Sequence, residues 1–204
     1  MAQLLLEKKA VIFSPSRPFT YASGRQGPLY CDNRQLLGYP VAFKQVGHWL
    51  SEQISELAPN AQSILGVATA GIPHATMSAL ELGLPTGYLR EKPKVHGRSN
   101  QIEGFLAEGS QVVVVEDLIN SGKSSWAATE ALLAKGHGVL GLFCLVDYEF
   151  SDAHQLFKSK GIPIFALTCF TQLLEEALAQ GMIKEEDRTT LLRWHANPDS
   201  WTAQ

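Results

Sequence analysis

The residues best suited to chemistry form one continuous stretch, from Gln111 to Ser125. Two carboxylates, Glu116 and Asp117, follow four consecutive valines, and a turn of small residues, 120–122, comes shortly after them. Backbone N–H groups in such a turn can converge on an anion, and nearby serine hydroxyls add further donors. The turn therefore suits a phosphate monoester, whereas the carboxylates suit hydroxyl groups such as those of ribose.

The elements that must position these groups can be read from the same stretch. Val112 to Val115 are β-branched and uninterrupted, which predicts a strand covered on both faces within a parallel sheet. A helical pattern begins near Ser124 and continues through Leu132, so its positive N-terminal dipole adjoins the turn. A strand, turn and helix with charge at the strand's carboxyl end is typical of ligand sites in open α/β sheets.

Two other interpretations of this stretch are less favoured. Residues 121–124, Ser-Gly-Lys-Ser, match the second half of a nucleotide-binding P-loop, but that motif needs a glycine five positions before Gly122. The residue there is Asp117. An ordinary strand and capped helix would explain one acid at a strand end, but two acids followed by a glycine-serine turn disfavour it.

The stretch from Val112 to Ser124 resembles the phosphoribosyl pyrophosphate (PRPP) motif of type I phosphoribosyltransferases. That motif is a hydrophobic strand, two acids, two aliphatic residues and a hydroxylated turn with glycine. The resemblance implies that the acids hold the ribose hydroxyls and that the turn holds the 5′-phosphate. The implied PRPP-binding residues are Glu116, Asp117, Leu118, Ile119, Asn120, Ser121, Gly122, Lys123 and Ser124.

A basic segment runs from Arg90 to Asn100, where Pro93 and Gly97 oppose a regular helix. Taken alone, it reads as a solvated surface loop. It resembles the mobile catalytic loop of orotate phosphoribosyltransferases, Arg-x-x-x-Lys-x-His-Gly. The resemblance implies that Arg90, Lys94 and His96 bind PRPP, and that Lys94 and His96 stabilise the departing pyrophosphate.

An amino-terminal appendage is predicted from residues 19–34, where two short aromatic-bearing strands flank Gly24 and Gly27-Pro28. This antiparallel ribbon resembles the hood of orotate phosphoribosyltransferases. The matching residues are Phe19, Thr20, Ser23, Gly24, Pro28 and Tyr30. The resemblance implies that Tyr30 and Cys31 line the pocket for orotate, while packing inside the hood is the alternative role for Tyr30.

The remaining chain alternates helical and strand patterns. Helices are predicted over 3–12 and 40–57, and strands over 63–68, 86–89, 139–147 and 162–168. The pattern predicts a single α/β domain over residues 1–204, with a mainly parallel sheet flanked by helices and residues 1–38 forming the hood. The histidines outside the basic segment read as packing or surface residues.

Composition limits the partners and the compartment. A net charge of −3 and a pI near 6.1 predict no overall attraction to nucleic acid or membranes. The cysteines, at 31, 144 and 169, have no metal-ligand spacing and read as free thiols of a reducing compartment. The amino terminus has too short an apolar run for a signal peptide, so a cytoplasmic protein is expected.

Together the resemblances imply an orotate phosphoribosyltransferase. Such an enzyme converts orotate and PRPP to orotidine monophosphate and pyrophosphate in pyrimidine synthesis, with Mg²⁺ carried by PRPP rather than by a protein metal site. They also imply that Asp117 acts in catalysis with Lys94 and His96, that Asn120 meets orotate, and that the loop is shared across a homodimer.

The chain departs from the family pattern at four positions, Ala22, Glu91, Asn120 and Lys123. Two alternatives therefore stay open: a phosphoribosyltransferase for another nucleobase, and a non-catalytic sensor of PRPP or nucleotides built on the same fold. The retained acids, Lys94 and His96 disfavour the sensor.

Overall fold

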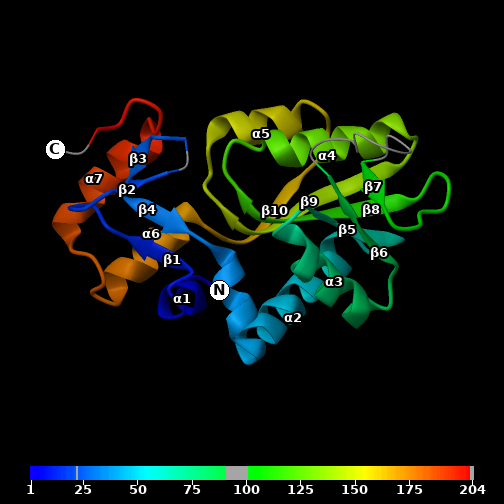
Figure 1. Cartoon of the computed structure of the whole chain (residues 1–204), viewed down its shortest axis with the longest axis horizontal. Helices are drawn as coiled ribbons and strands as arrows, with labels where there is room; N and C mark the ends of the chain where they lie inside the picture. Colours follow the sequence, from blue (N-terminus) through cyan, green and yellow to red (C-terminus); the bar gives the residue numbers. More distant parts are fainter. Residues whose placement is uncertain (22, 91–100, 203–204) are drawn as a thin grey trace. The chain divides into compact units, whose positions relative to one another are not determined.

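The computed structural model describes residues 1–21, 23–90 and 101–202, drawn in Figure 1. These residues fall into two compact units. The larger unit comprises residues 40–167, and the smaller unit combines residues 1–39 with the chain from 168 onward. Residues 1–38, predicted as a hood, thus belong to the same unit as the carboxy-terminal helices.

A six-stranded sheet forms within the described part of the chain, in the order β10-β9-β8-β5-β6-β7. Strands β5, β6, β8 and β9 pair in parallel, and β7 is antiparallel to β6. The mainly parallel sheet expected from the sequence is therefore confirmed. The bounds are β5 (Ser63–Val67), β6 (Thr86–Leu89), β7 (Ile102–Glu103), β8 (Gln111–Ile119), β9 (Gly138–Asp147) and β10 (Ile164–Cys169).

Helices cover both faces of this sheet, as Figure 1 shows. Helices α4 (Lys123–Ala134) and α5 (Ser151–Lys158) lie on one face. Helices α2 (Pro40–Leu57) and α3 (Gly71–Leu82) lie on the other. Val112 to Val115 of β8 are fully buried between the two layers, as a run of four apolar β-branched residues predicts.

The smaller unit contains two antiparallel pairs, β1 with β4 and β2 with β3. The antiparallel ribbon expected near Gly24 is therefore present. The helix expected over 3–12 is wrong in its second half. It ends at Glu7, Lys9 has φ 54°, and the chain then enters β1, which pairs with β4. The bounds are α1 (Ala2–Glu7), β1 (Val11–Phe13), β2 (Phe19–Thr20), β3 (Gln26–Gly27), β4 (Leu29–Cys31) and the 3₁₀ helix η1 (Asn33–Gly38).

Two carboxy-terminal helices, α6 (Phe170–Ala179) and α7 (Glu185–Ala196), complete the smaller unit. The ring of Phe170 stacks on His195, with centroids 4.2 Å apart. Arg188 on α7 forms ion pairs with Glu175 on α6 and with Glu185. Aromatic stacking and a bidentate guanidinium contact therefore join the two helices.

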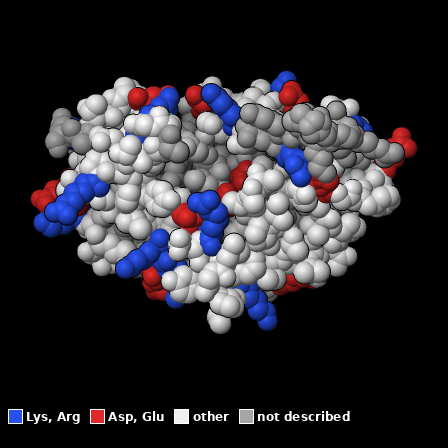
Figure 2. Space-filling model, in the orientation of Figure 1, with Lys and Arg blue, Asp and Glu red and all other residues white. Residues whose placement is uncertain are grey.

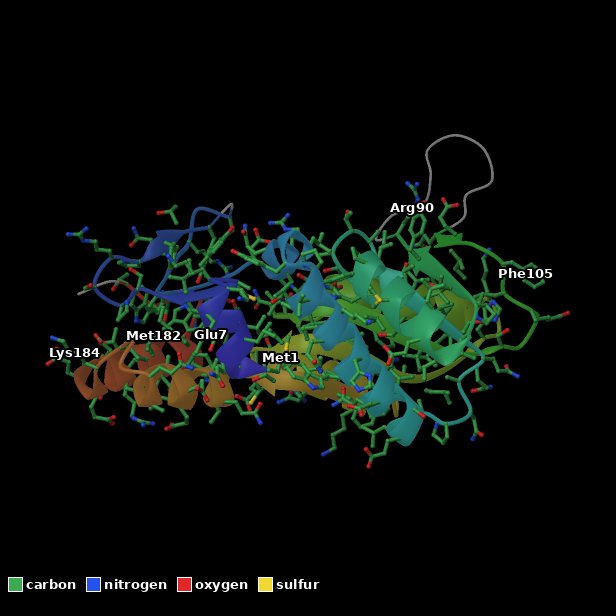
Figure 3. The ribbon with its side chains drawn as sticks, turned by 90° about the horizontal axis from the view of Figure 1, so that it is seen from below. Met1, Glu7, Arg90, Phe105, Met182 and Lys184 are labelled. Atoms are coloured by element: carbon green, nitrogen blue, oxygen red, sulfur yellow. The ribbon has the colours of Figure 1, made fainter. Side chains whose placement is uncertain are left out.

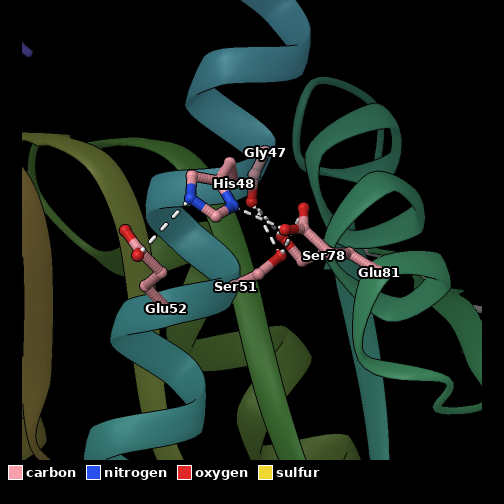
Figure 4. Close-up of polar contacts among 6 residues, drawn as sticks. All are labelled: Gly47, His48, Ser51, Glu52, Ser78 and Glu81. Atoms are coloured by element: carbon pink, nitrogen blue, oxygen red, sulfur yellow. Dashed lines mark hydrogen bonds and ion pairs between the residues drawn. The ribbon is translucent and has the colours of Figure 1, made fainter.

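A polar cluster joins α2 to α3 on one face of the sheet (Figure 4). His48 Nδ1 lies 2.6 Å from Glu81 Oε1, and His48 Nε2 lies 3.4 Å from Glu52 Oε1. The hydroxyl oxygen of Ser51 lies 2.8 Å from the carbonyl oxygen of Gly47 and 3.3 Å from Glu81 Oε2, so its one hydrogen is shared between the two acceptors. The hydrogen bond to Glu81, aided by the charge of Glu52, raises the pKa of His48 above its usual value near 6.5.

Replacing His48 by glutamine should make thermal stability depend less on pH. Because the folded-state pKa of His48 is raised, its charged form stabilises the fold below about pH 6.5, and this contribution is lost as pH rises past the folded-state pKa. The variant should therefore lower the melting temperature more at pH 6 than at pH 9. Equal losses at both pH values would contradict this, and Lys44→Gln on the same helix serves as a control.

Candidate functional site

The acidic pair lies inside strand β8 rather than after it. The strand extends through Glu116 and Asp117 to Ile119, four residues past the last valine. Successive side chains of a strand point to opposite faces, so the two carboxylates leave the backbone in opposite directions. Glu116 is buried, with 7% of its surface exposed, whereas Asp117 is half-buried.

The Glu116 carboxylate is held by two protein donors. Its Oε1 accepts the backbone N–H of Asp117 at 3.1 Å, and its Oε2 accepts the hydroxyl of Ser125, on α4, at 3.2 Å. Burial, followed by the negative charge of Asp117, raises the pKa of Glu116 well above its usual value near 4.5. The hydrogen bonds from Ser125 and the Asp117 backbone only partly oppose this shift.

The negative potential extends into the neighbouring strand. Cys144 of β9 pairs in register with Glu116 and is fully buried. Burial raises the pKa of its thiol, and the charges of Asp147, Glu116 and Asp117 raise it further. A group carrying positive charge would be stabilised at this end of the sheet.

The turn after β8 leads directly into α4. Asn120 and Ser121 are exposed, and Gly122 is the N-cap residue, with φ 70°. Helix α4 begins at Lys123, one residue before the predicted start. No side-chain hydrogen bond caps the start of α4, and the first amides of the helix point toward the turn, as they do in every α-helix.

Backbone groups approach the turn and the end of β8 closely at two glycines. A Cβ atom added to Gly71, at the start of α3, would lie 2.4 Å from the carbonyl oxygen of Val115. A Cβ atom added to Gly122 would lie 3.1 Å from Cβ of Ala153, on α5. The loop after β5 and the first turn of α5 thus flank the acidic pair and its turn within the larger unit.

A further polar pair at this edge of the sheet was not anticipated. Asp147 ends β9 and is buried, and its Oδ2 lies 2.6 Å from Nε2 of His154. Its Oδ1 accepts the backbone N–H of Glu149 at 2.7 Å. The signal was available, because Asp147 is an acid at the end of a buried apolar run, as Glu116 is. Its partner seven residues later had no sequence signature.

The other predicted residues are more widely distributed. Arg90, labelled in Figure 3, directly follows β6. Its Nε lies 3.0 Å from Oε1 of Glu103. Tyr30 and Cys31 belong to the smaller unit, where the ring of Tyr30 packs 5.3 Å from that of Phe19. Lys94 and His96 lie outside the described residues, as do Ala22 and Glu91.

His74 is the buried histidine of α3, with 1% of its surface exposed. Burial lowers its pKa to about 4, so the imidazole is neutral near pH 7. Its ring lies 5.3 Å from that of Phe43, on α2. The interpretation of His74 as a packing residue fits this position.

Charge is dispersed over the surface. On the face shown in Figure 2, described Lys and Arg side chains are scattered among acidic and uncharged groups and form no continuous basic patch. Among the described residues, no group of three or more His, Cys, Asp or Glu side chains could hold a metal ion. No helix within the described ranges is long and apolar enough to span a membrane.

Comparison with known proteins assigns the fold and site to a class. Residues 32–164 match the model of the phosphoribosyl transferase domain, so the strand, acids and turn belong to a phosphoribosyltransferase. The chain is 42% identical over 201 residues to an orotate phosphoribosyltransferase of Enterococcus faecalis, covering 98% of this chain and 96% of the relative. It is 44% identical over 200 residues to that of Bacillus subtilis, covering 98% and 93%.

A solved structure shows the same relationship. The crystal structure of orotate phosphoribosyltransferase from Aeropyrum pernix superposes with a TM-score of 0.77 and 32% identity, covering 90% of this chain and 99% of that one. This chain belongs to the orotate phosphoribosyltransferase family.

Replacing Glu116 by glutamine should stabilise the fold at neutral pH. Because the pKa of Glu116 is raised in the folded state, its ionisation opposes folding as pH rises above about 4.5, and glutamine removes that cost. The hydroxyl of Ser125 can reverse its hydrogen bond to suit the amide. The free energy of unfolding of Glu116→Gln should exceed that of the parent at pH 7, and the difference should shrink toward pH 4.

Chemical denaturation at several pH values tests this prediction. Glu130→Gln, an exposed change of the same kind on α4, provides the control and should show no such pH-dependent gain. A less stable Glu116→Gln at pH 7 would show that the carboxylate is a net stabilising group.

Proposed function

We propose that this chain transfers the phosphoribosyl group of PRPP to orotate, giving orotidine 5′-monophosphate and diphosphate in de novo pyrimidine synthesis. The observation that carries the proposal is the end of β8, where two carboxylates precede an amide-rich turn and helix. Similarity to orotate phosphoribosyltransferases over nearly the whole chain selects orotate as the acceptor.

In this proposal, each part of the β8 edge holds one part of PRPP. The backbone amides from Asn120 to Ser124, together with the hydroxyls of Ser121 and Ser124, bind the 5′-phosphate at the positive end of α4. Glu116 and Asp117 are assigned to the ribose hydroxyls, and Asp117 is the more exposed of the two acids. Leu118 and Ile119 carry the chain from the acids to the turn.

The reaction forms one bond and breaks one bond at the anomeric carbon. A ring nitrogen of orotate donates its electron pair to that carbon, and the carbon–oxygen bond to diphosphate breaks, its electron pair leaving with diphosphate. Positive charge develops on the ribose in between, and the acidic edge of the sheet stabilises it. Lys94, His96 and Arg90 are assigned to the growing charge on diphosphate.

Orotate is assigned to Tyr30, Cys31 and Asn120. Asn120 replaces the hydroxyl residue of the family pattern and can both donate and accept hydrogen bonds. Lys123 is exposed at the first position of α4, where an ammonium group can add to phosphate attraction.

Magnesium is proposed to arrive bound to PRPP. Mg²⁺ prefers oxygen ligands, keeps several waters and is commonly held by one or two carboxylates together with substrate phosphates. The phosphate oxygens of PRPP supply such ligands, so the ion needs no protein metal site in this proposal. When bound, the ion neutralises charge on the diphosphate leaving group.

We also propose a homodimer in which the loop beginning at Arg90 reaches the neighbouring site. In this arrangement the loop supplies cations and excludes water from PRPP while the reaction proceeds. The activity is assigned to the cytoplasm, a compartment in which the thiols of Cys31, Cys144 and Cys169, which form no disulfide, remain reduced.

A competition assay tests the acceptor. Orotate, uracil and hypoxanthine are offered together with PRPP and Mg²⁺, and the nucleotide products are separated by chromatography. Orotidine monophosphate should be the main product. Uridine or inosine monophosphate as the main product would assign another base, and no turnover with any acceptor would favour the sensor.

Replacing Lys94 by alanine should lower turnover by roughly 10- to 150-fold, because a charge-assisted contact is worth about 1.5–3 kcal/mol. The melting temperature should barely change. Lys44→Ala removes an exposed lysine from α2 and is the matched control for lost charge. Unchanged turnover in Lys94→Ala would show that this lysine does not act on PRPP and would favour the alternative, a solvated surface residue.

A further inference from the structure

Helix α5 packs directly on the phosphate turn. Gly122 has no Cβ, and the space where one would lie is bounded by Ala153 Cβ at 3.1 Å and a ring carbon of Phe157 at 3.4 Å. The ring of Phe157 also meets Trp126, in the first turn of α4, edge-on at 5.5 Å. The turn and the start of α4 therefore rest on α5, so a shift of α5 would move the amides proposed to bind phosphate.

The first turn of α5 is fixed to the sheet by Asp147. Phe150, the N-cap residue, makes no side-chain cap hydrogen bond. Instead, Asp147 accepts the N–H of Glu149 at 2.7 Å and contacts His154 at 2.6 Å, spanning the connection between β9 and α5. Glu149 has φ 59°, a conformation that costs a non-glycine residue free energy. The carboxylate thus holds both the strained connection and the helix.

The pair is built to hold one geometry. Asp147 is 4% exposed, whereas the side chain of His154 is half-exposed. The carboxylate that accepts is therefore buried, and the imidazole that donates is in contact with solvent. If the imidazole of His154 moved away, the buried carboxylate of Asp147 would lose a donor without gaining water in its place. This free-energy cost favours the paired position of the imidazole. Asp147 lies opposite Ile119 in the β8–β9 register, at the last position of β8 before the turn.

We propose that Asp147 and His154 are positioning residues that hold α5 against the turn after β8 and thereby set the affinity for the phosphate monoester of PRPP. The inference rests on the proposed function, in which that turn binds the 5′-phosphate. The pair acts through Ala153 and Phe157 on Gly122, without touching substrate.

Steady-state kinetics of two substitutions test the proposal. His154→Ala should raise KM for PRPP by about three- to ten-fold while kcat stays within about two-fold, because ground-state binding is weakened and the reacting groups are unchanged. His154→Gln retains a side-chain N–H donor for Asp147 and should recover most of the affinity. Gln155→Ala, an exposed change at the next position of α5, is the matched control and should behave like the parent.

A double-mutant cycle shows whether the two residues act together. Asp147→Asn and His154→Ala should combine with less than additive loss of PRPP affinity, as expected for residues in contact. An unchanged KM in His154→Ala would overturn the proposal. It would also be overturned if His154→Gln were as impaired as His154→Ala, or if both lowered kcat and melting temperature with KM unchanged.

Calorimetric titration with PRPP distinguishes a failure of the positioning role from a failure of the proposed phosphate site. Ser124→Ala removes a hydroxyl at the start of α4 that the proposed function assigns to the 5′-phosphate, so it should weaken PRPP binding whether or not the Asp147–His154 pair matters. If Ser124→Ala weakens binding and His154→Ala does not, the positioning role fails and the phosphate site stands. If neither weakens binding, the assignment of the turn to phosphate fails.

Discussion

The carboxylate of Glu116 is held where its own surroundings oppose its ionisation. It is buried at the end of a fully buried run of valines, and the charge of Asp117 raises its pKa further. Such a group persists only when the surrounding core is stable enough to offset its cost, which the two-sided burial of β8 provides. Burial is the larger cause of this raised pKa and the charge of Asp117 the smaller one, so in the proposed reaction Asp117 is the acid whose negative charge favours a ribose carbon that becomes positive.

Close backbone contact is the second condition for this edge of the sheet. A Cβ atom on Gly71 would lie 2.4 Å from the carbonyl oxygen of Val115, which leaves no room for a side chain, whereas Gly122 has φ 70°, a conformation that residues with side chains rarely adopt. Glycine at these two positions lets the loop after β5 and the turn after β8 pass close to neighbouring groups near the acids. A larger residue at either position would displace the amides that the proposed function requires.

Local patterns predicted much of this arrangement, because they depend on neighbours in the chain. The valine run, the helix over 40–57 and the acids beside a glycine turn each carry their own signal, and each appears in the structure. Specific side-chain pairs, and the packing of elements far apart in the sequence, were not predicted. Nothing near Asp147 indicates that His154 would pair with it, and no periodicity indicates that α6 and α7 would join the amino-terminal hood. The second half of the helix predicted over 3–12 was wrong for a related reason, because the pairing of β1 with β4 overrides the helical pattern there.

The division of the chain into units bears on how the acceptor base is chosen. The phosphoribosyl transferase domain model matches residues 32–164, which take in the acids and the turn but leave out most of the smaller unit. Phosphate and ribose are common to every enzyme of the class, so the matched segment cannot by itself distinguish orotate from another base. Identity to the orotate enzymes covers 98% of the chain and therefore extends through the smaller unit, which contains Tyr30 and Cys31. In the proposed function, Tyr30 and Cys31 of the hood therefore contribute to the choice of orotate together with Asn120.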